Sequence, residues 1–207
     1  MGSDNDGHLV GDLTFGPGFV ASGNGEAFHF DGDNDLVYVG DAADLALSHF
    51  TIDAWIQTAS SSVQTVVHRG PAGVPTQTNY HLFIEQGVGF FQISDGKIVD
   101  QIRGVSVIGD DLFHHIAGTF DQSTRELRLY VDGVLEFSKT STVVAAFSGG
   151  LTSQLTIGAM DGSDPPGIDP VNDYAGIIDE VRVFSRPLSA DEIRQVFGDG
   201  SGGQCKI

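Results

Sequence analysis

Short hydrophobic runs rich in Val, Ile, Phe, Thr and Tyr recur along the chain, and Gly, Asp, Ser or Pro separates each run from the next. Runs of about five to eight such residues are typical of β-strands. The pattern predicts strands at 27–30, 36–39, 50–57, 63–68, 80–85, 89–94, 113–120, 127–131, 134–138, 155–158 and 177–184. This spacing indicates an all-β protein.

Two Asp-Gly pairs, Asp95-Gly96 and Asp132-Gly133, lie between such runs. Two-residue hairpin turns need a positive φ at both central residues, which Asp and Gly tolerate. Hairpins pair strands antiparallel, so an antiparallel sandwich is favoured over an α/β fold. One short C-terminal helix is predicted after Ser189, because Ser189 and Glu192 form a capping box, and Gly198 follows it.

The 207 residues, 40% of them hydrophobic, suffice for one sandwich domain. Lys and Arg total 10 against 28 Asp and Glu, and the formal net charge is -18. Binding to nucleic acid or to an anionic membrane surface is therefore disfavoured. No apolar run approaches the roughly 18 residues that a membrane-spanning helix needs. Asp accounts for 22 of the acids, which suits calcium sites but also suits solubility or a saline habitat.

The chain divides into three expected segments. Residues 1–25 form an N-terminal segment that begins with Met1-Gly2-Ser3, which resembles a cloning remnant, and that carries the first strand. Residues 26–197 form the sandwich, and the Gly-rich residues 198–207 form a flexible tail that could lead to another module. Cys205 is the only cysteine, so no intrachain disulfide can form.

The last predicted strand contains an acidic residue among aliphatic ones. Strict alternation along 177–184 places Asp179 on one face with Ile177, Val181 and Val183. A carboxylate in such surroundings costs several kcal/mol unless it is paired, hydrogen-bonded or metal-bound. Two explanations stay open: backbone N–H groups at a sheet edge hold Asp179, or it is a structural calcium ligand.

A second acidic feature is the turn Asp31-Gly32-Asp33-Asn34-Asp35, which follows directly after a predicted strand. Its three carboxylates, at alternate positions, could surround a hard cation. The turn does not match the EF-hand pattern, and the same residues are also common in ordinary turns. We expect Asp31, Asp33, Asp35 and Asp179 to form one calcium site.

Candidate ligand-binding residues come from two further regions. The predicted strand at 50–57 places Asp53 and Trp55 on one face, although a lone tryptophan more often belongs to the core than to a sugar platform. The long irregular stretch at 160–173 is acidic, and such loops often build binding sites, although a solvated connection without a site is an equal alternative. The candidates are Trp55, Asp53, Tyr80, Asp161, Asp164, Asp169, Asn172 and Asp173.

Catalytic motifs are scarce in the sequence. No H-E-x-x-H or G-x-S-x-G motif is present, and His114 and His115 lie on opposite faces of one predicted strand. A glycosidase needs two carboxylates flanking its substrate, but no E-x-D triplet lies in any predicted strand. Binding is therefore favoured over catalysis, although carboxylates could still meet from different strands.

Several segments in order resemble the laminin-G-like jelly rolls of the concanavalin-A-like lectin and glucanase superfamily. They are FHFDGDNDLVYV, FTIDAWI, FHHIAGTFD, LRLYVDGVL, LTIGA and GIIDEVRVFSRPLSADEI, and the resemblance covers about residues 26–197. It implies a two-sheet antiparallel jelly roll, carried mostly by secreted or surface proteins, that binds glycans or protein partners. It also implies a structural calcium near the N-terminal strand and the penultimate strand, which by position would involve Asp179 and oxygens around 31–35.

We therefore expect a non-catalytic, calcium-stabilised carbohydrate-binding or cell-adhesion module of a larger extracellular or cell-surface bacterial protein. The alternative is a protein-interaction or structural module, and a divergent glycanase or polysaccharide lyase is less favoured. The glycan or surface protein that it binds and its oligomeric state stay open.

Overall fold

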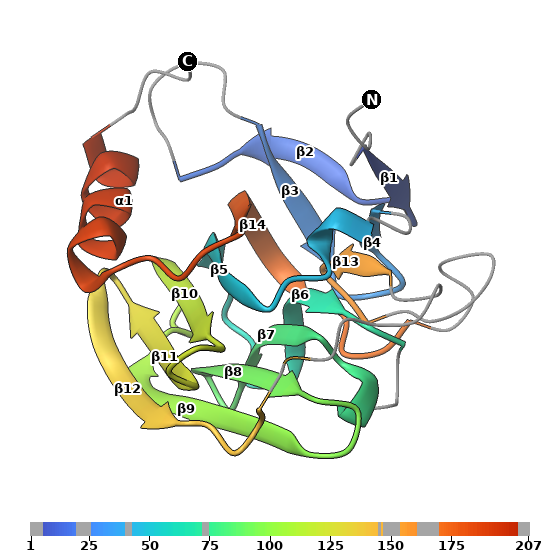
Figure 1. Cartoon of the computed structure of the whole chain (residues 1–207). Coiled ribbons are helices and arrows are strands. Elements are labelled where there is room, and N and C mark those ends of the chain that lie inside the picture. Colours follow the sequence, from blue (N-terminus) through green and yellow to red (C-terminus); the bar gives the residue numbers. More distant parts are fainter. Residues whose placement is uncertain are drawn as a thin grey trace.

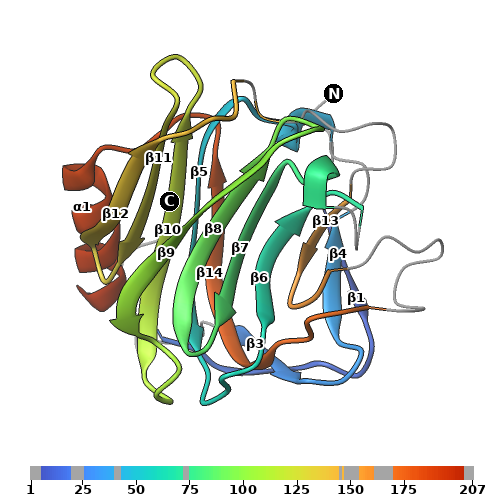
Figure 2. The ribbon, with the colours of Figure 1, turned by 90° about the horizontal axis from the view of Figure 1, so that it is seen from below.

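A computed structural model describes residues 6–19, 26–39, 43–71, 75–144, 146, 154–160 and 170–202. In this part of the chain, fourteen strands form two antiparallel seven-stranded sheets stacked face to face (Figures 1 and 2). The predicted two-sheet jelly-roll sandwich is thus confirmed.

The two sheets draw strands from distant parts of the chain. The first sheet has the order β1 (Gly7–Val10), β4 (Leu36–Val39), β13 (Leu155–Ile157), β6 (Gln64–Arg69), β7 (Tyr80–Glu85), β8 (Val88–Ser94) and β9 (Val99–Val107). The second has the order β12 (Val134–Thr140), β11 (Glu126–Val131), β10 (Phe113–Asp121), β5 (His49–Gln57), β14 (Ala175–Phe184), β3 (Glu26–Asp31) and β2 (Thr14–Pro17). Short 3-10 turns, η1 (Ala43–Leu45) and η2 (Pro75–Gln77), precede β5 and β7.

The main core lies between the sheets, where alternate residues of each strand point inward. Phe50 of β5 contacts the rings of Tyr80 on β7 and Phe91 on β8, at centroid distances of 5.1 and 6.2 Å. All three side chains are fully buried. Burial of this apolar surface is the main driving force for the fold. The single cysteine allows no intrachain disulfide that could add to it.

The eleven strands predicted with bounds are all present. Three others, β1, β2 and β9, were not located from the sequence, although one strand was expected within residues 1–25. The strands β1 and β2 are only four residues long, and β9 mixes Asp, Gln, Arg and Gly with its hydrophobic residues. The turn at Asp132-Gly133 has positive φ at both residues, as predicted. At Asp95-Gly96 only the glycine has a positive φ. The turn there belongs to a longer loop, in which Asp95 Oδ1 accepts the backbone N–H groups of Lys97 and Ile98.

The strict alternation predicted for 177–184 is wrong. A β-bulge interrupts β14 after Asp179, and Glu180 has a φ of 48°. An extra residue reverses which face the following side chains occupy. Val181 and Val183 therefore pack on the main core, while Asp179 does not share their face.

The predicted capping box is confirmed. Glu192 Oε2 accepts a hydrogen bond from the Ser189 backbone N–H at 2.8 Å, and Ser189 Oγ accepts one from the Glu192 N–H at 3.3 Å. The helix α1 (Ala190–Gly202) continues past Gly198, so the tail predicted from residue 198 is helical as far as Gly202.

Helix α1 covers part of the outer face of the second sheet, beside β10, β11 and β12 (Figure 2). Ile193 and the preceding Leu188 pack on Ala117 and Tyr130. Among the described residues, no helix is long and apolar enough to cross a membrane. The outer face of the first sheet carries no helix in these ranges, and it holds the pocket described next.

Candidate functional site

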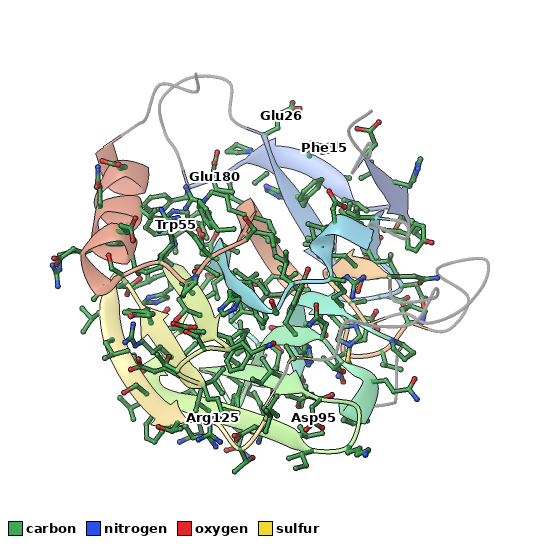
Figure 3. All side chains as sticks on the ribbon, viewed as in Figure 1. Phe15, Glu26, Trp55, Asp95, Arg125 and Glu180 are labelled. Atoms are coloured by element: carbon green, nitrogen blue, oxygen red, sulfur yellow. The ribbon has the colours of Figure 1, made fainter. Side chains whose placement is uncertain are left out.

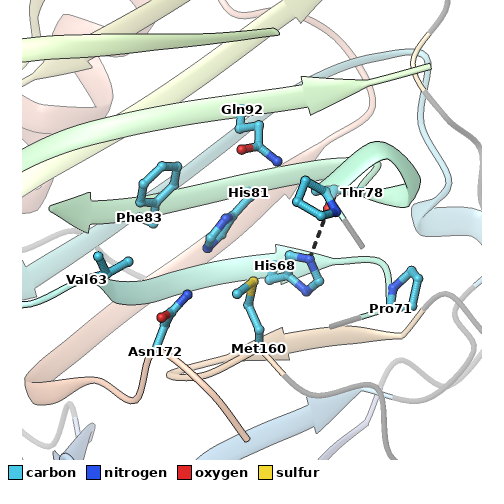
Figure 4. A pocket seen from close by; sticks show the side chains of 10 residues that line it. Val63, His68, Pro71, Thr78, His81, Phe83, Gln92, Met160 and Asn172 are labelled. Carbon is cyan, nitrogen blue, oxygen red and sulfur yellow. Dashed lines mark hydrogen bonds between the residues drawn. The ribbon is translucent and has the colours of Figure 1, made fainter. Parts of the chain in front are cut away.

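A pocket of about 180 Å³ lies on the outer face of the first sheet (Figure 4). Strand residues form its floor, with His68 from β6, His81 and Phe83 from β7, and Gln92 from β8. The surrounding loops add Val63, Pro71, Pro75, Thr78, Met160 and Asn172. Of the lining residues that the structure describes, none is Asp, Glu, Lys or Arg.

Strand register creates this floor. His68 is paired with His81, and His81 with Gln92, so three polar side chains form a row across three strands. The ring of His81 stacks on that of Phe83 at 4.4 Å. Phe83 in turn stacks on Phe90 at 5.0 Å, which extends the aromatic surface away from the pocket. The floor therefore combines flat apolar rings with neutral hydrogen-bonding groups.

Both histidines are buried, and this fixes their charge. Burial lowers the pKa of His68 to about 3. Burial also lowers the pKa of His81 well below its usual value, and the neighbouring His68 lowers the pKa of His81 further. Both imidazoles are therefore neutral at physiological pH. His68 Nε2 shares a hydrogen bond with Thr78 Oγ1 at 3.3 Å (Figure 4), and His68 Nδ1 has no partner within the described ranges.

Asn172 and Met160 come from the two ends of the long loop singled out in the sequence. The backbones of Met160 and Val171 exchange two hydrogen bonds of 2.9 Å, which close the base of the loop. Asn172 has a φ of 59°, and its carbonyl accepts the N–H of Thr65, next to a bulge in β6. Among the described residues, Asn172 is thus the one predicted ligand residue that lines the pocket, and its binding role stays a prediction. Asp161, Asp164 and Asp169 lie outside the described residues.

Three carboxylates meet at the end of β3, away from the pocket lining. Asp12, Asp31 and Asp35 each place one oxygen within 4.8 Å of the other two. Asp35 is 1% exposed and accepts the backbone N–H groups of Asp12 at 2.8 Å and of Asp31 at 3.3 Å. Gly11, with a φ of 88°, allows this approach, because a Cβ there would lie 2.3 Å from Asp35 Oδ1. No sequence pattern indicated Asp12, which lies far upstream of the turn.

Asp173 adds negative charge to the same region. Its burial, together with the charges of Asp33 and Asp35, raises the pKa of Asp173. Its Oδ1 is buried and lacks a hydrogen-bond partner among the described groups. Oxygens bound to one calcium at 2.3–2.6 Å lie at most about 5 Å apart. The three converging carboxylates fit that spacing, and a cation there would also relieve the repulsion felt by Asp173.

Asp179 is not part of this group, so the prediction of one site joining it to residues 31–35 is wrong. Ala175 is the strand partner of Asp31, and Asp179 lies four residues farther along β14, a separation of about 13 Å at the usual strand rise. The Asp179 carboxylate accepts the backbone N–H groups of Phe19 at 3.0 Å and Glu180 at 2.8 Å. Asp179 therefore matches the other explanation offered for it in the sequence analysis, a carboxylate held by backbone N–H groups.

Trp55, Asp53 and Tyr80 are buried, so the structure does not support the prediction that they contact a ligand. Trp55 is 1% exposed beneath aromatic side chains. Asp53 Oδ1 accepts hydrogen bonds from Arg182 Nε at 2.8 Å and Nη2 at 2.6 Å, and it contacts His115 Nε2 at 3.1 Å. Tyr80 belongs to the main core.

The comparisons with known proteins agree with this fold. The family described as the concanavalin A-like lectin/glucanases superfamily matches residues 31–194. Among curated proteins, the rat sushi, von Willebrand factor type A, EGF and pentraxin domain-containing protein 1 is 27% identical over 109 residues. That match covers 52% of this chain and only 3% of the rat protein.

Solved structures resemble the chain over almost its whole length at low identity. The CBM40 domain of the Ruminococcus gnavus IT-sialidase, bound to α2,3-sialyllactose, has a TM-score of 0.66 at 18% identity and covers 95% of this chain and 100% of its own. The binding domain of botulinum neurotoxin DC in complex with SialylT has a TM-score of 0.66 at 13% identity, covering 94% of this chain and 46% of its own. At such identities the likeness establishes the fold alone.

Proposed function

The chain belongs to the concanavalin A-like lectin/glucanases superfamily, and from this premise we propose that it is a non-catalytic carbohydrate-binding module. The pocket on the first sheet carries the proposal. Ligand pockets combine apolar walls with a few placed polar groups. Here Phe83, stacked between His81 and Phe90, gives the pocket an apolar wall beside the amides of Gln92 and Asn172.

Sugars have the complementary chemistry, with apolar C–H groups on the ring face and hydroxyl groups around the rim. The amides of Gln92 and Asn172 can each donate and accept hydrogen bonds. The sialyllactose complex of the Ruminococcus gnavus domain shows that one protein of this fold binds a glycan. The botulinum neurotoxin DC binding domain, whose fold is also similar, has been solved in complex with SialylT.

The pocket chemistry also supports binding without catalysis. Glycosidases of the usual kind place two carboxyl groups on either side of the scissile bond. The described lining contains no carboxylate. The buried Asp53, held by Arg182 and His115 on the other sheet, is not available to a substrate in this pocket.

A protein-interaction or adhesion role is the second candidate, and an exposed apolar strip favours it. Strands β9 and β12 lie side by side at one edge of the sandwich (Figure 2). Val105, Val107, Val134 and Phe137 on these strands are 46–73% exposed. The botulinum neurotoxin DC binding domain, whose fold is similar, has been solved with rat synaptotagmin II.

We propose further that calcium stabilises the module through Asp12, Asp31 and Asp35, next to Asp33 and Asp173. Their spacing supports a hard cation with oxygen ligands. Extracellular modules bind calcium at about 10⁻⁴–10⁻³ M. A place outside the cell or on its surface, within a larger bacterial protein, would supply that concentration.

Affinity measurements with glycans test the glycan-binding proposal. The full chain is passed over immobilised neutral and acidic glycans with calcium and then with EDTA, next to the variants Asn172→Ala and Gln92→Ala. We expect retention that either variant weakens about tenfold, which is the loss of about 1.4 kcal/mol. The surface variant Val105→Ser, on the apolar strip, should bind as the wild type does. Retention of no glycan would contradict the proposal, and equal binding by the Asn172 and Gln92 variants would exclude this pocket.

A further inference from the structure

The positive charges that the structure describes lie away from the pocket. The chain has only ten Lys and Arg residues. Five of them are engaged in ion pairs, namely Arg128, Lys139, Arg182, Arg186 and Arg194. Lys97 and Arg125 lie in turns at the ends of hairpins, and Lys206 lies outside the described residues.

The two remaining cations belong to strands of the first sheet, and neither lines the pocket. Arg69 follows His68 on β6, so its side chain points to the opposite face, where it is 1% exposed. The Arg103 guanidinium lies 5.8 Å from the ring centre of Phe90. Phe90 stacks on the outer side of Phe83, which places Arg103 a full aromatic ring beyond the pocket lining.

The histidines do not replace these missing cations. His68 and His81 are 1% and 5% exposed, and their burial keeps both imidazoles neutral, as their lowered pKa values indicate. An imidazolium there would need a nearby carboxylate, and the described lining offers none. At neutral pH the described lining of the pocket therefore presents dipoles without formal charge.

The rest of the molecule opposes anions. The formal net charge is -18, which creates a negative potential around the protein. Recognition of a carboxylate usually depends on Arg or Lys, because charge-assisted hydrogen bonds are about twice as strong as neutral ones. A carboxylate in this pocket would lose its hydration without gaining such a partner.

We propose that this pocket recognises an uncharged sugar unit and discriminates against acidic sugars such as sialic and uronic acids. The inference rests on the proposed carbohydrate binding and specifies its ligand class. It separates this protein from the Ruminococcus gnavus domain, which was solved with sialyllactose. Gln92 and Asn172 supply neutral partners for hydroxyl groups, and Phe83 supplies an apolar wall for the sugar.

Matched pairs of sugars provide the test. The neutral probes are the methyl glycosides of glucose, galactose, mannose, fucose and N-acetylglucosamine, and the acidic probes are those of glucuronic, galacturonic and sialic acid. Glucose and glucuronic acid differ only at C6, as do galactose and galacturonic acid. Each probe is titrated into the full chain by calorimetry and by ligand-observed NMR, with calcium present.

We expect at least one neutral probe to bind, every acidic probe to bind about tenfold more weakly than that neutral probe or worse, and Asn172→Ala to weaken the neutral probe. Binding of an acidic probe as tight as its neutral counterpart, or tighter, and weakened by Asn172→Ala, would overturn the inference and leave the carbohydrate-binding proposal intact. Failure of every probe, neutral and acidic, would overturn both. Neutral binding that Asn172→Ala and Gln92→Ala leave unchanged would show that the recognition lies elsewhere and would also overturn the inference.

Discussion

The indole of Trp55 stacks on the ring of Phe19, with centroids 3.5 Å and planes 10° apart. Phe197 of α1 stacks beside it at 5.4 Å, and Figure 3 shows Trp55 beside this helix. The only tryptophan of the chain thus joins the helix and the segment before β3 to β5. An aromatic residue buried between two others is a structural element and offers no platform for a sugar.

Replacement of Trp55 should therefore affect stability and leave binding unchanged. We expect Trp55→Ala to lower the free energy of unfolding by about 3–5 kcal/mol, as for other large buried aromatics. Urea denaturation measures the loss, and Trp55→Phe should lose less because an aromatic ring is kept. Glycan affinity measured well below the melting temperature should match that of the wild type. Loss of binding by folded Trp55→Phe would show that the indole contacts ligand after all.

Removal of calcium should lower the stability of the wild type. At a calcium concentration about 100 times the dissociation constant, binding adds about 2.7 kcal/mol to the free energy of unfolding. We expect EDTA to lower the melting temperature of the wild type and to leave that of Asp12→Asn unchanged, because Asp12 supplies one of the three oxygens.

Asp179→Asn is the matched control for this experiment. Asp179 accepts two backbone N–H groups and lies outside the three-carboxylate group, so its replacement should lower stability with and without calcium. The difference caused by EDTA should persist in this variant. A wild type that melts at the same temperature in calcium and in EDTA would contradict the calcium proposal, and loss of the EDTA effect in Asp179→Asn would return Asp179 to the site.

The variant Asp173→Asn should stabilise the protein when calcium is absent. The folded state raises the pKa of Asp173 above its unfolded value, so the stability that this residue contributes is present at low pH and is lost as the carboxyl ionises. At neutral pH without calcium, the charge is therefore destabilising. In EDTA we expect Asp173→Asn to raise the free energy of unfolding by less than about 1 kcal/mol, because the group is partly exposed, and to raise the melting temperature accordingly. Scanning calorimetry in EDTA and in calcium measures this, and a lower melting temperature in EDTA would contradict it.

Local sequence patterns predicted much of the fold. The alternation along β5 placed Asp53 and Trp55 on the face opposite Phe50, and Ser189 and Glu192 located the start of α1. These features depend on residues close together in the chain. The same alternation failed on β14, because a single bulge at Glu180 changes the face of every later residue and has no sequence signal.

The sites depend on contacts between distant segments, which one sequence does not reveal. The polar residues of the pocket floor, His68, His81 and Gln92, lie at alternate positions of three strands, and only the strand register joins them. Asp12 reaches Asp35 because the chain between β1 and β2 passes the turn after β3. The sequence indicated that carboxylates gather at the turn 31–35. It did not indicate that Asp12 would join them.

Acidification should destabilise the protein through its buried histidines. The pKa of His68 is lowered to about 3 in the folded state, so below pH 6.5 the unfolded state binds a proton that the folded state does not. Stability is therefore lost as pH falls from about 6.5, by about 1.4 kcal/mol per pH unit. His114 has the opposite effect on how stability changes with pH, because its hydrogen bond to Asp132 raises the pKa of His114.

The variant His68→Gln isolates the first effect. Between pH 7 and pH 5 its free energy of unfolding should fall by about 2 kcal/mol less than that of the wild type. Urea denaturation at each pH measures the difference, and His114→Gln should change the pH dependence with the opposite sign. Equal pH dependence in the wild type and His68→Gln would show that His68 is protonated in the folded state.

Glu136 protects the free edge of the first sheet. Its Oε2 accepts the N–H groups of Val105 and Ser106 on β9, the last strand of that sheet. Unpaired edge groups next to exposed apolar residues promote association with other chains. We expect Glu136→Ala to self-associate more than the wild type, as measured by light scattering and sedimentation velocity. Glu26→Ala removes the same charge from the exposed start of β3 and should stay as dispersed as the wild type. If both variants associate equally, net charge rather than the covered edge limits association.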